Sequence, residues 1–160
     1  MAVKEQDAGR SIVNSVVSPA ADYEVDFFEW TQSTAELIRQ GRLAEVDLEH
    51  LAEEIESMGK RDRREVQSRL IVLLTHLLKW EFQPEMRKTS WRSTIREQRK
   101  QVRLVVGDSP SLGRLPREDL PALFRSAVED AIEETGLDAN HFPSSCPYTP
   151  DQVLDSDFLP

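Results

Sequence analysis

The stretch DLEHLAEEIESMGKRDRREVQSRLIVLLTHLLKWEF, residues 47–82, decides the fold. Its apolar residues keep to one stripe of an α-helix, because they follow one another at intervals close to one or two helical turns. The stripe consists of Leu48, Leu51, Ile55, Met58, Val66, Leu70, Leu73, Leu77 and Trp80. Between Leu70 and Leu78 the neighbouring positions are apolar as well, and a helix that is apolar on all sides belongs in a protein interior. We therefore expect residues 70–78 to form the centre of the fold.

Gly59 interrupts this stretch and allows two interpretations. If the helix stopped there, Asp62 and Glu65 would resemble a capping box that starts a second helix. If the helix continued, Gly59 would cost about 1 kcal/mol relative to alanine, and the stripe would stay in phase. Acidic residues precede Gly59, and a helix C-terminus prefers cations. We favour one helix over residues 47–82, whose acidic end projects or pairs with a second subunit.

The other segments predict more helices around this one. A helix over about residues 26–40 would have one side formed by Phe27, Trp30, Thr34, Leu37 and Ile38. Two further amphipathic helices are expected near residues 90–106 and 119–135.

The C-terminal segment, residues 137–160, has too many apolar side chains for a free tail, so we expect it to wrap against the bundle. Thr149 would begin a one-turn helix within it. The predicted fold class is all-α, a small helical bundle around a long central helix.

The length of 160 residues suits a loose tail over residues 1–21 and one helical domain over residues 22–160. We find neither an apolar run long enough for a membrane span nor the apolar region of a secretory signal, which makes the cytoplasm the expected location. Cys146 is the only cysteine, so no intrachain disulfide is possible. We expect it to be an ordinary thiol.

Charge is distributed unevenly along the chain, whose net charge is −9. Residues 1–59 carry a net charge of −9, residues 60–103 one of +8, and residues 104–160 one of −8. In a helical bundle such a basic middle segment would be compensated by acidic neighbours. The low pI, about 4.9, argues against a dedicated nucleic-acid-binding domain.

Several sequence blocks together resemble a known bacterial family. These are DFFEWTQSTAELIRQGR, LAEEIESMG, SRLIVLLTHLLKWEFQPE, SWRSTIREQR and FPSSCPYTPDQVLDSDFLP. They are similar to the proteins grouped as domain-of-unknown-function family 29, common in cyanobacteria and some proteobacteria, and the likeness covers about residues 23–160. The resemblance implies a small all-helical protein and carries over no catalytic residues.

Arg69 and His76 are the candidate catalytic pair, since seven residues place them on one helix face. An arginine can hold a phosphate while a histidine transfers protons, and the pair resembles the Arg-x(4-6)-His motif of the helical HEPN ribonucleases. Metal-independent RNA cleavage is thus one alternative function, although those enzymes usually have a polar residue where Leu70 follows the arginine. A structural histidine, bonded to a carbonyl or a carboxylate, explains the same residues.

A metal site would draw on His50, Glu53 and Glu54, because His50 and Glu54 are four residues apart on one helix face. We expect an exposed acidic face there instead, with no metal and no cofactor. The basic segment 87–103 could contact nucleic-acid phosphates while Trp91 stacks on a base, which is a second alternative function.

Protein association is the function we favour: a non-enzymatic interaction or self-associating module, either a homodimer or bound to a partner protein. It rests on the charge pattern and on more apolar residues than a small bundle can bury. The polar and aromatic groups nearest the central helices are the expected site. The candidate binding residues are Glu54, Trp80, Trp91, Arg92 and Arg96, with Arg69 and His76 beside them.

Overall fold

The protein is known from a computed structural model that describes residues 21–160. Over these residues it contains helices and no strand, which confirms the predicted fold class. The tail predicted over residues 1–21 lies outside the described residues apart from Ala21. The sequence predicted one domain over residues 22–160, and within that range the structure shows two compact units. Unit 1 comprises the described residues up to Ile55, and unit 2 is Glu56–Pro160.

Helix α2, Leu48–Phe82, is unbroken and crosses the boundary between the units. Gly59 lies inside it, which confirms the prediction of one long helix. Within residues 70–79 most side chains are buried: Leu70, Leu73, Leu74, Thr75, Leu77, Leu78 and Lys79. The prediction that residues 70–78 lie in the interior is therefore confirmed. At the other end of the helix, Leu48, Ile55 and Met58 are exposed.

Unit 1 contains α1, Phe27–Arg39, the 3-10 turn η1, Leu43–Glu45, and the first residues of α2. The Asp26 carboxylate accepts a hydrogen bond from the Glu29 amide at 2.9 Å, which caps α1. Trp30, Thr34 and Leu37 are the buried residues of α1, at 3%, 3% and 2% exposure.

Phe27 and Ile38, which the sequence places on the same side of this helix, are 50% and 42% exposed. Unit 1 is small, so α1 can bury only the middle of its apolar side, and the residues at the edges of that side remain in contact with water.

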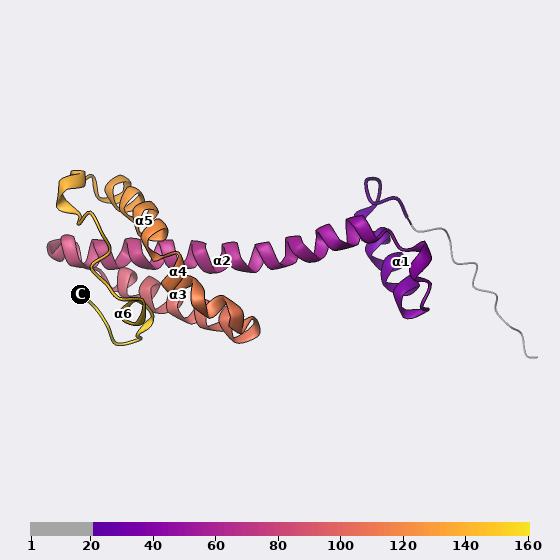
Figure 1. The fold of residues 1–160 in the computed structure, drawn as a ribbon. Helices are drawn as coiled ribbons and strands as arrows, with labels where there is room; N and C mark the ends of the chain where they lie inside the picture. Colours follow the sequence, from indigo (N-terminus) through magenta and orange to yellow (C-terminus); the bar gives the residue numbers. More distant parts are fainter. Residues whose placement is uncertain (1–20) are drawn as a thin grey trace, which may run out of the picture. The chain divides into compact units, whose positions relative to one another are not determined.

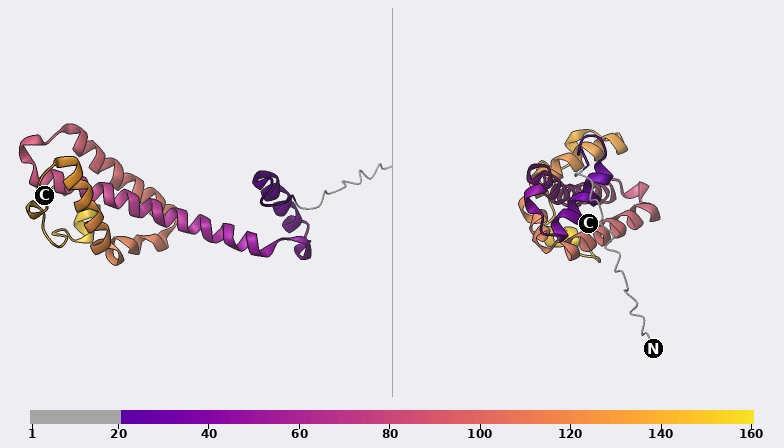
Figure 2. Two further views of the ribbon diagram at one scale, coloured as in Figure 1. Left: turned by 90° about the horizontal axis from the view of Figure 1, so that it is seen from above. Right: turned by 90° about the vertical axis from the view of Figure 1, so that its right-hand side faces the viewer.

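Unit 2 contains the rest of α2 and the remaining helices. The further α-helices are α3, Thr89–Asp108, α4, Leu115–Glu118, α5, Leu120–Thr135, and α6, Pro150–Leu154. The 3-10 turns are η2, Pro84–Met86, η3, Pro110–Arg114, and η4, Ala139–His141. Figure 1 shows α3 and α5 alongside the second half of α2, and the further views of Figure 2 agree.

The core of unit 2 is formed where α2, α3 and α5 meet, with Leu77, Ile95 and Ala127 almost fully buried. The C-terminal segment covers this core, because Phe142, Tyr148 and Val153 are buried as well. That confirms the predicted apolar wrap.

The one-turn helix α6 begins at a complete capping box. The Thr149 hydroxyl accepts from the Gln152 amide, and the Gln152 side chain accepts from the Thr149 amide. The predicted start of this helix at Thr149 is thereby confirmed.

Candidate functional site

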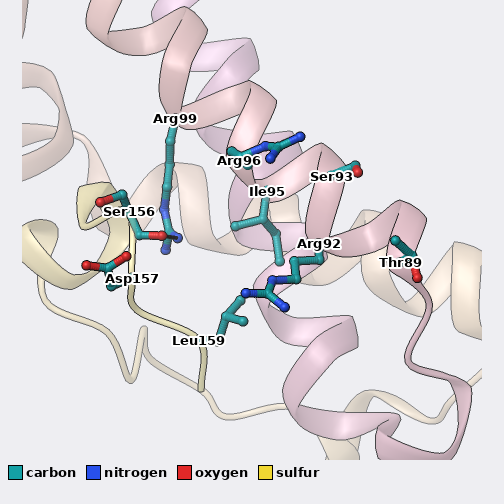
Figure 3. A pocket seen from close by; sticks show the side chains of 9 residues that line it. All are labelled: Thr89, Arg92, Ser93, Ile95, Arg96, Arg99, Ser156, Asp157 and Leu159. Atoms are coloured by element: carbon teal, nitrogen blue, oxygen red, sulfur yellow. Dashed lines mark hydrogen bonds between the residues drawn. The ribbon is translucent and has the colours of Figure 1, made fainter.

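Two of the predicted binding residues, Arg92 and Arg96, line one cavity of about 540 Å³ in unit 2. We call this cavity the arginine pocket. Its lining consists of Thr89, Arg92, Ser93, Ile95, Arg96 and Arg99 from α3, and of Ser156, Asp157 and Leu159 from the C-terminal segment. In Figure 3 Arg99 extends from α3 toward Ser156 and Asp157, and Arg92 lies beside Leu159. The pocket therefore combines guanidinium groups with hydroxyl groups and an apolar wall.

Arg99 is the buried arginine of the pocket, with only 1% of its surface exposed. Its Nε donates to the Val153 carbonyl at 2.8 Å, and its Nη1 and Nη2 donate to the carbonyls of Ser156 and Gln152 at 3.5 and 3.4 Å. Burial lowers the pKa of the guanidinium from its ordinary value, and Asp155 acts in the opposite direction. Arg99 thus ties α3 to the end of α6 through neutral acceptors.

The two predicted aromatic residues, Trp80 and Trp91, each lie under a cation. The guanidinium of Arg87 is 5.0 Å from the ring centroid of Trp80, and its Nε donates to the Trp80 carbonyl at 2.8 Å. The Nζ of Lys79 is 4.7 Å from the Trp91 centroid and also forms an ion pair with Glu134. Neither tryptophan lines the arginine pocket. Each tryptophan ring therefore makes a cation–π contact within the fold.

Arg69 and His76 each bind a group of their own helix. An Nη of Arg69 lies 3.3 Å from a Glu65 carboxylate oxygen, and Nδ1 of His76 lies 2.9 Å from the Val72 carbonyl. Burial lowers the pKa of His76, and the nearby Lys79 adds to that effect. No hydrogen bond joins Arg69 to His76 among the described residues. The ribonuclease interpretation stays a prediction, and an RNA cleavage assay of His76→Ala tests it.

The candidate metal ligands His50 and Glu54 have protein partners in unit 1. Nδ1 of His50 lies 2.6 Å from an Asp47 carboxylate oxygen, and the Tyr23 hydroxyl donates to Glu54 at 2.6 Å. The Tyr23 ring also stacks on the His50 ring at 4.2 Å between centroids. The contact with Glu54 raises the pKa of Tyr23 to about 12. Within residues 21–160 no group of three or more potential ligands, Glu53 included, is arranged to hold a metal ion.

Large apolar side chains on the surface are concentrated in unit 1. Of the described residues, those up to Ile55 include seven: Val25, Phe27, Phe28, Ile38, Leu43, Leu48 and Ile55. We call these seven the apolar group of unit 1. The larger unit 2 has only Met58, Met86 and Leu104 in this class. Val25 and Phe28 are the most open, at 81% and 70% exposure, and they lie three residues apart at the start of α1.

The same unit is strongly acidic. Residues 21–55 contain ten carboxylates and two arginines, a net charge of −8. Both arginines lie near carboxylates of unit 1: Arg39 beside Glu36, and Arg42 beside Glu45. The apolar group of unit 1 therefore lies on a unit with excess negative charge.

Sequence reasoning missed Arg99, Ser156 and Asp157 as members of a pocket. A signal for Arg99 did exist, because it lies between Ile95 and Val102 on the inner stripe of α3. An arginine on a buried stripe requires acceptors and is a candidate for a special role. No comparable signal marks Ser156 and Asp157, whose place depends on the course of the C-terminal segment.

Fold and surface together define a small all-helical domain with an acidic, apolar N-terminal unit and a basic pocket in its C-terminal unit. No helix among the described residues is long and apolar enough to cross a membrane. The chain belongs to the family whose model is described as "Domain of unknown function DUF29", which matches residues 23–159. This confirms the resemblance noted from the sequence. The comparisons found no match among curated proteins or solved structures.

Proposed function

We propose that this protein is an interaction module whose unit 1 binds a basic, apolar segment of a partner protein. The observation that carries the proposal is the apolar group of unit 1: seven large apolar side chains are exposed within 35 residues. Exposed apolar side chains scattered singly are ordinary, and larger exposed apolar patches mark interaction sites, so the concentration of seven on one small unit supports this proposal.

Burial of these side chains supplies the affinity in this proposal. A large apolar side chain contributes about 1.5–3 kcal/mol when it passes from full exposure to full burial. Phe28 and Val25 are the best anchors, because they retain most of their surface in the free protein.

Charge supports a basic partner rather than a second copy. Two apposed copies of unit 1 would bring together net charges of −8 and −8. Like charges across an interface are unfavourable, while opposite charges accelerate association and favour the correct partner. The homodimer predicted from the sequence stays a prediction, and the experiment below distinguishes it from a partner protein.

Site-specific photo-crosslinking in the native organism tests the proposal. A photoreactive phenylalanine analogue replaces Phe28 in one strain and Met86, an exposed apolar residue of unit 2, in a control strain. The proposal expects an adduct at position 28, absent at position 86, in which the crosslinked peptide of the partner is basic and apolar. The adduct should weaken when Val25 is also changed to serine.

Three outcomes contradict the proposal. Crosslinks from position 28 to a second copy of the chain would establish self-association instead. Crosslinks to residues 1–20 of the same chain would mean that the protein covers its own apolar group. Equal labelling at positions 28 and 86 would show that the apolar group of unit 1 is not a binding site.

A further inference from the structure

The arginine pocket is a ligand-sized cavity that the proposed function does not use. Its volume is about 540 Å³, within the range of small-molecule sites. One wall is a single face of α3, because Arg92, Arg96 and Arg99 follow at steps of four and three. The opposite wall is the C-terminal segment around Ser156 and Asp157. Both walls belong to unit 2.

Charge in the pocket is unbalanced toward the positive. Three guanidinium groups line it together with one carboxylate, that of Asp157. Among the described residues, none of the ion pairs involves Arg92, Arg96 or Arg99. The neighbouring Asp155 carboxylate accepts from the Asp157 amide at 3.0 Å. A negatively charged ligand would therefore relieve repulsion between the guanidinium groups.

Part of this excess positive charge is buried, because Arg99 is buried. A guanidinium has five N–H donors, and here three nitrogens share three neutral carbonyl acceptors, two of them at long distances. Asp155 and Asp157 favour the charge of Arg99, but neither forms an ion pair with it, so this buried charge at a cavity wall favours an anion as ligand. Hydroxyl groups of Thr89 and Ser93 line the same cavity and can donate further hydrogen bonds.

The rest of the lining favours an organic molecule over a bare ion. Ile95 and Leu159 contribute apolar surface to the pocket. A ligand that fills the cavity would place its charged group against the arginines and its carbon skeleton against these two residues. Guanidinium groups bind phosphate oxygens through paired hydrogen bonds.

We propose that the arginine pocket binds a small organic phosphate monoester, with Arg92, Arg96 and Arg99 as its phosphate-binding residues. The dianionic phosphate group offers three acceptor oxygens to three guanidinium groups. The inference is independent of the proposed function, because the pocket lies in unit 2 and the apolar group lies in unit 1.

Calorimetric titration of the full chain at low salt tests this, with phenyl phosphate as the probe and inorganic phosphate, benzoate and a short single-stranded RNA as comparisons. Phenyl phosphate should bind more tightly than inorganic phosphate and benzoate. The double variant R92Q/R96Q should weaken binding at least about tenfold, since hydrogen bonds between charged groups are the strong ones. The matched control K100Q/R103Q removes two charges from the same helix outside the pocket lining and should change binding less than about twofold.

Arg99 is left unchanged in these variants because it also supports the fold, and circular dichroism checks that each variant is folded. Equal weakening by the two double variants would reveal unspecific attraction to a basic helix and overturn the proposal. So would tighter binding of benzoate than of phenyl phosphate, or no heat from phenyl phosphate at millimolar concentration. RNA that binds more tightly than phenyl phosphate and depends on Lys100 and Arg103 would identify α3 as a nucleic-acid surface instead.

Discussion

Replacing Arg99 should loosen the C-terminal segment from α3, and the size of the effect follows from its contacts. The hydrogen bond to the Val153 carbonyl is short, at 2.8 Å, and lies beside a fully buried residue. The contacts to Gln152 and Ser156 are longer, and both of those residues are exposed, so water can replace Arg99 there. The loss of stability therefore comes mainly from one charge-assisted hydrogen bond and from the Val153 carbonyl, which is left unpaired.

A hydrogen bond to a charged group contributes about 1.5–3 kcal/mol, and the side-chain stem adds packing. We expect Arg99→Ala to reduce the free energy of unfolding by about 2–4 kcal/mol. Arg99→Met keeps most of the stem and removes the unfavourable burial of a charge, so its loss should be smaller, about 1–2 kcal/mol.

Urea unfolding followed by far-ultraviolet circular dichroism measures both variants against the wild type. Chymotrypsin digestion provides a local readout, because Tyr148 and Phe158 flank the residues that Arg99 holds. Cleavage there should become faster in both variants. If Arg99→Met unfolded at the wild-type urea concentration and Phe158 stayed protected, the argument that Arg99 anchors this segment would be wrong.

Three further predictions concern single positions. Leu77→Ala should cost about 2–5 kcal/mol in urea unfolding, because Leu77 is fully buried between helices; a loss below about 1 kcal/mol would contradict the described core. Gly59→Ala should stabilise the protein by about 0.5–1 kcal/mol, since a Cβ there meets nothing within 4 Å. Gly136→Ala should destabilise it by about 1 kcal/mol because φ at Gly136 is +69°. Stability changes of the same sign in the two variants would refute this. In an NMR titration the pKa of His50 should lie above, and that of His76 below, the ordinary value of about 6.5. The contribution of His50 to stability is then present at low pH and is lost as pH rises through its raised pKa. At His76 the unfolded state takes up a proton at higher pH than the folded state does. His76 therefore lowers stability as pH falls below about 6.5. The His76→Gln variant should not show the loss of stability that His76 causes below about pH 6.5.

The long helix could be predicted because its apolar stripe stays in phase across Gly59, and a local pattern of that kind is visible in the sequence. The burial of residues 70–78 followed from the same pattern. The exposure of Phe27 and Ile38 could not be predicted, because it depends on how little surface the partners of α1 offer in unit 1. Periodicity identifies an apolar side, and its burial requires something of sufficient size to cover it.

The candidate site was predictable only in part for a similar reason. Arg92 and Arg96 were predicted as polar groups near the central helices, and the structure places both at the arginine pocket. Ser156 and Asp157 reach the pocket through the fold of the C-terminal segment, about sixty residues further along the chain. Residue spacing in the sequence does not predict that the C-terminal segment lies against α3.

The placement of the three tryptophans gives each unit its own optical reporter. Trp30 is buried in unit 1, whereas Trp80 and Trp91 belong to unit 2 and lie against cations. A chain with phenylalanine at positions 80 and 91 would therefore emit tryptophan fluorescence from unit 1 alone, and a chain with phenylalanine at position 30 would emit it from unit 2 alone. Melting curves of these two chains would show directly whether unit 1 and unit 2 lose their structure together or one after the other.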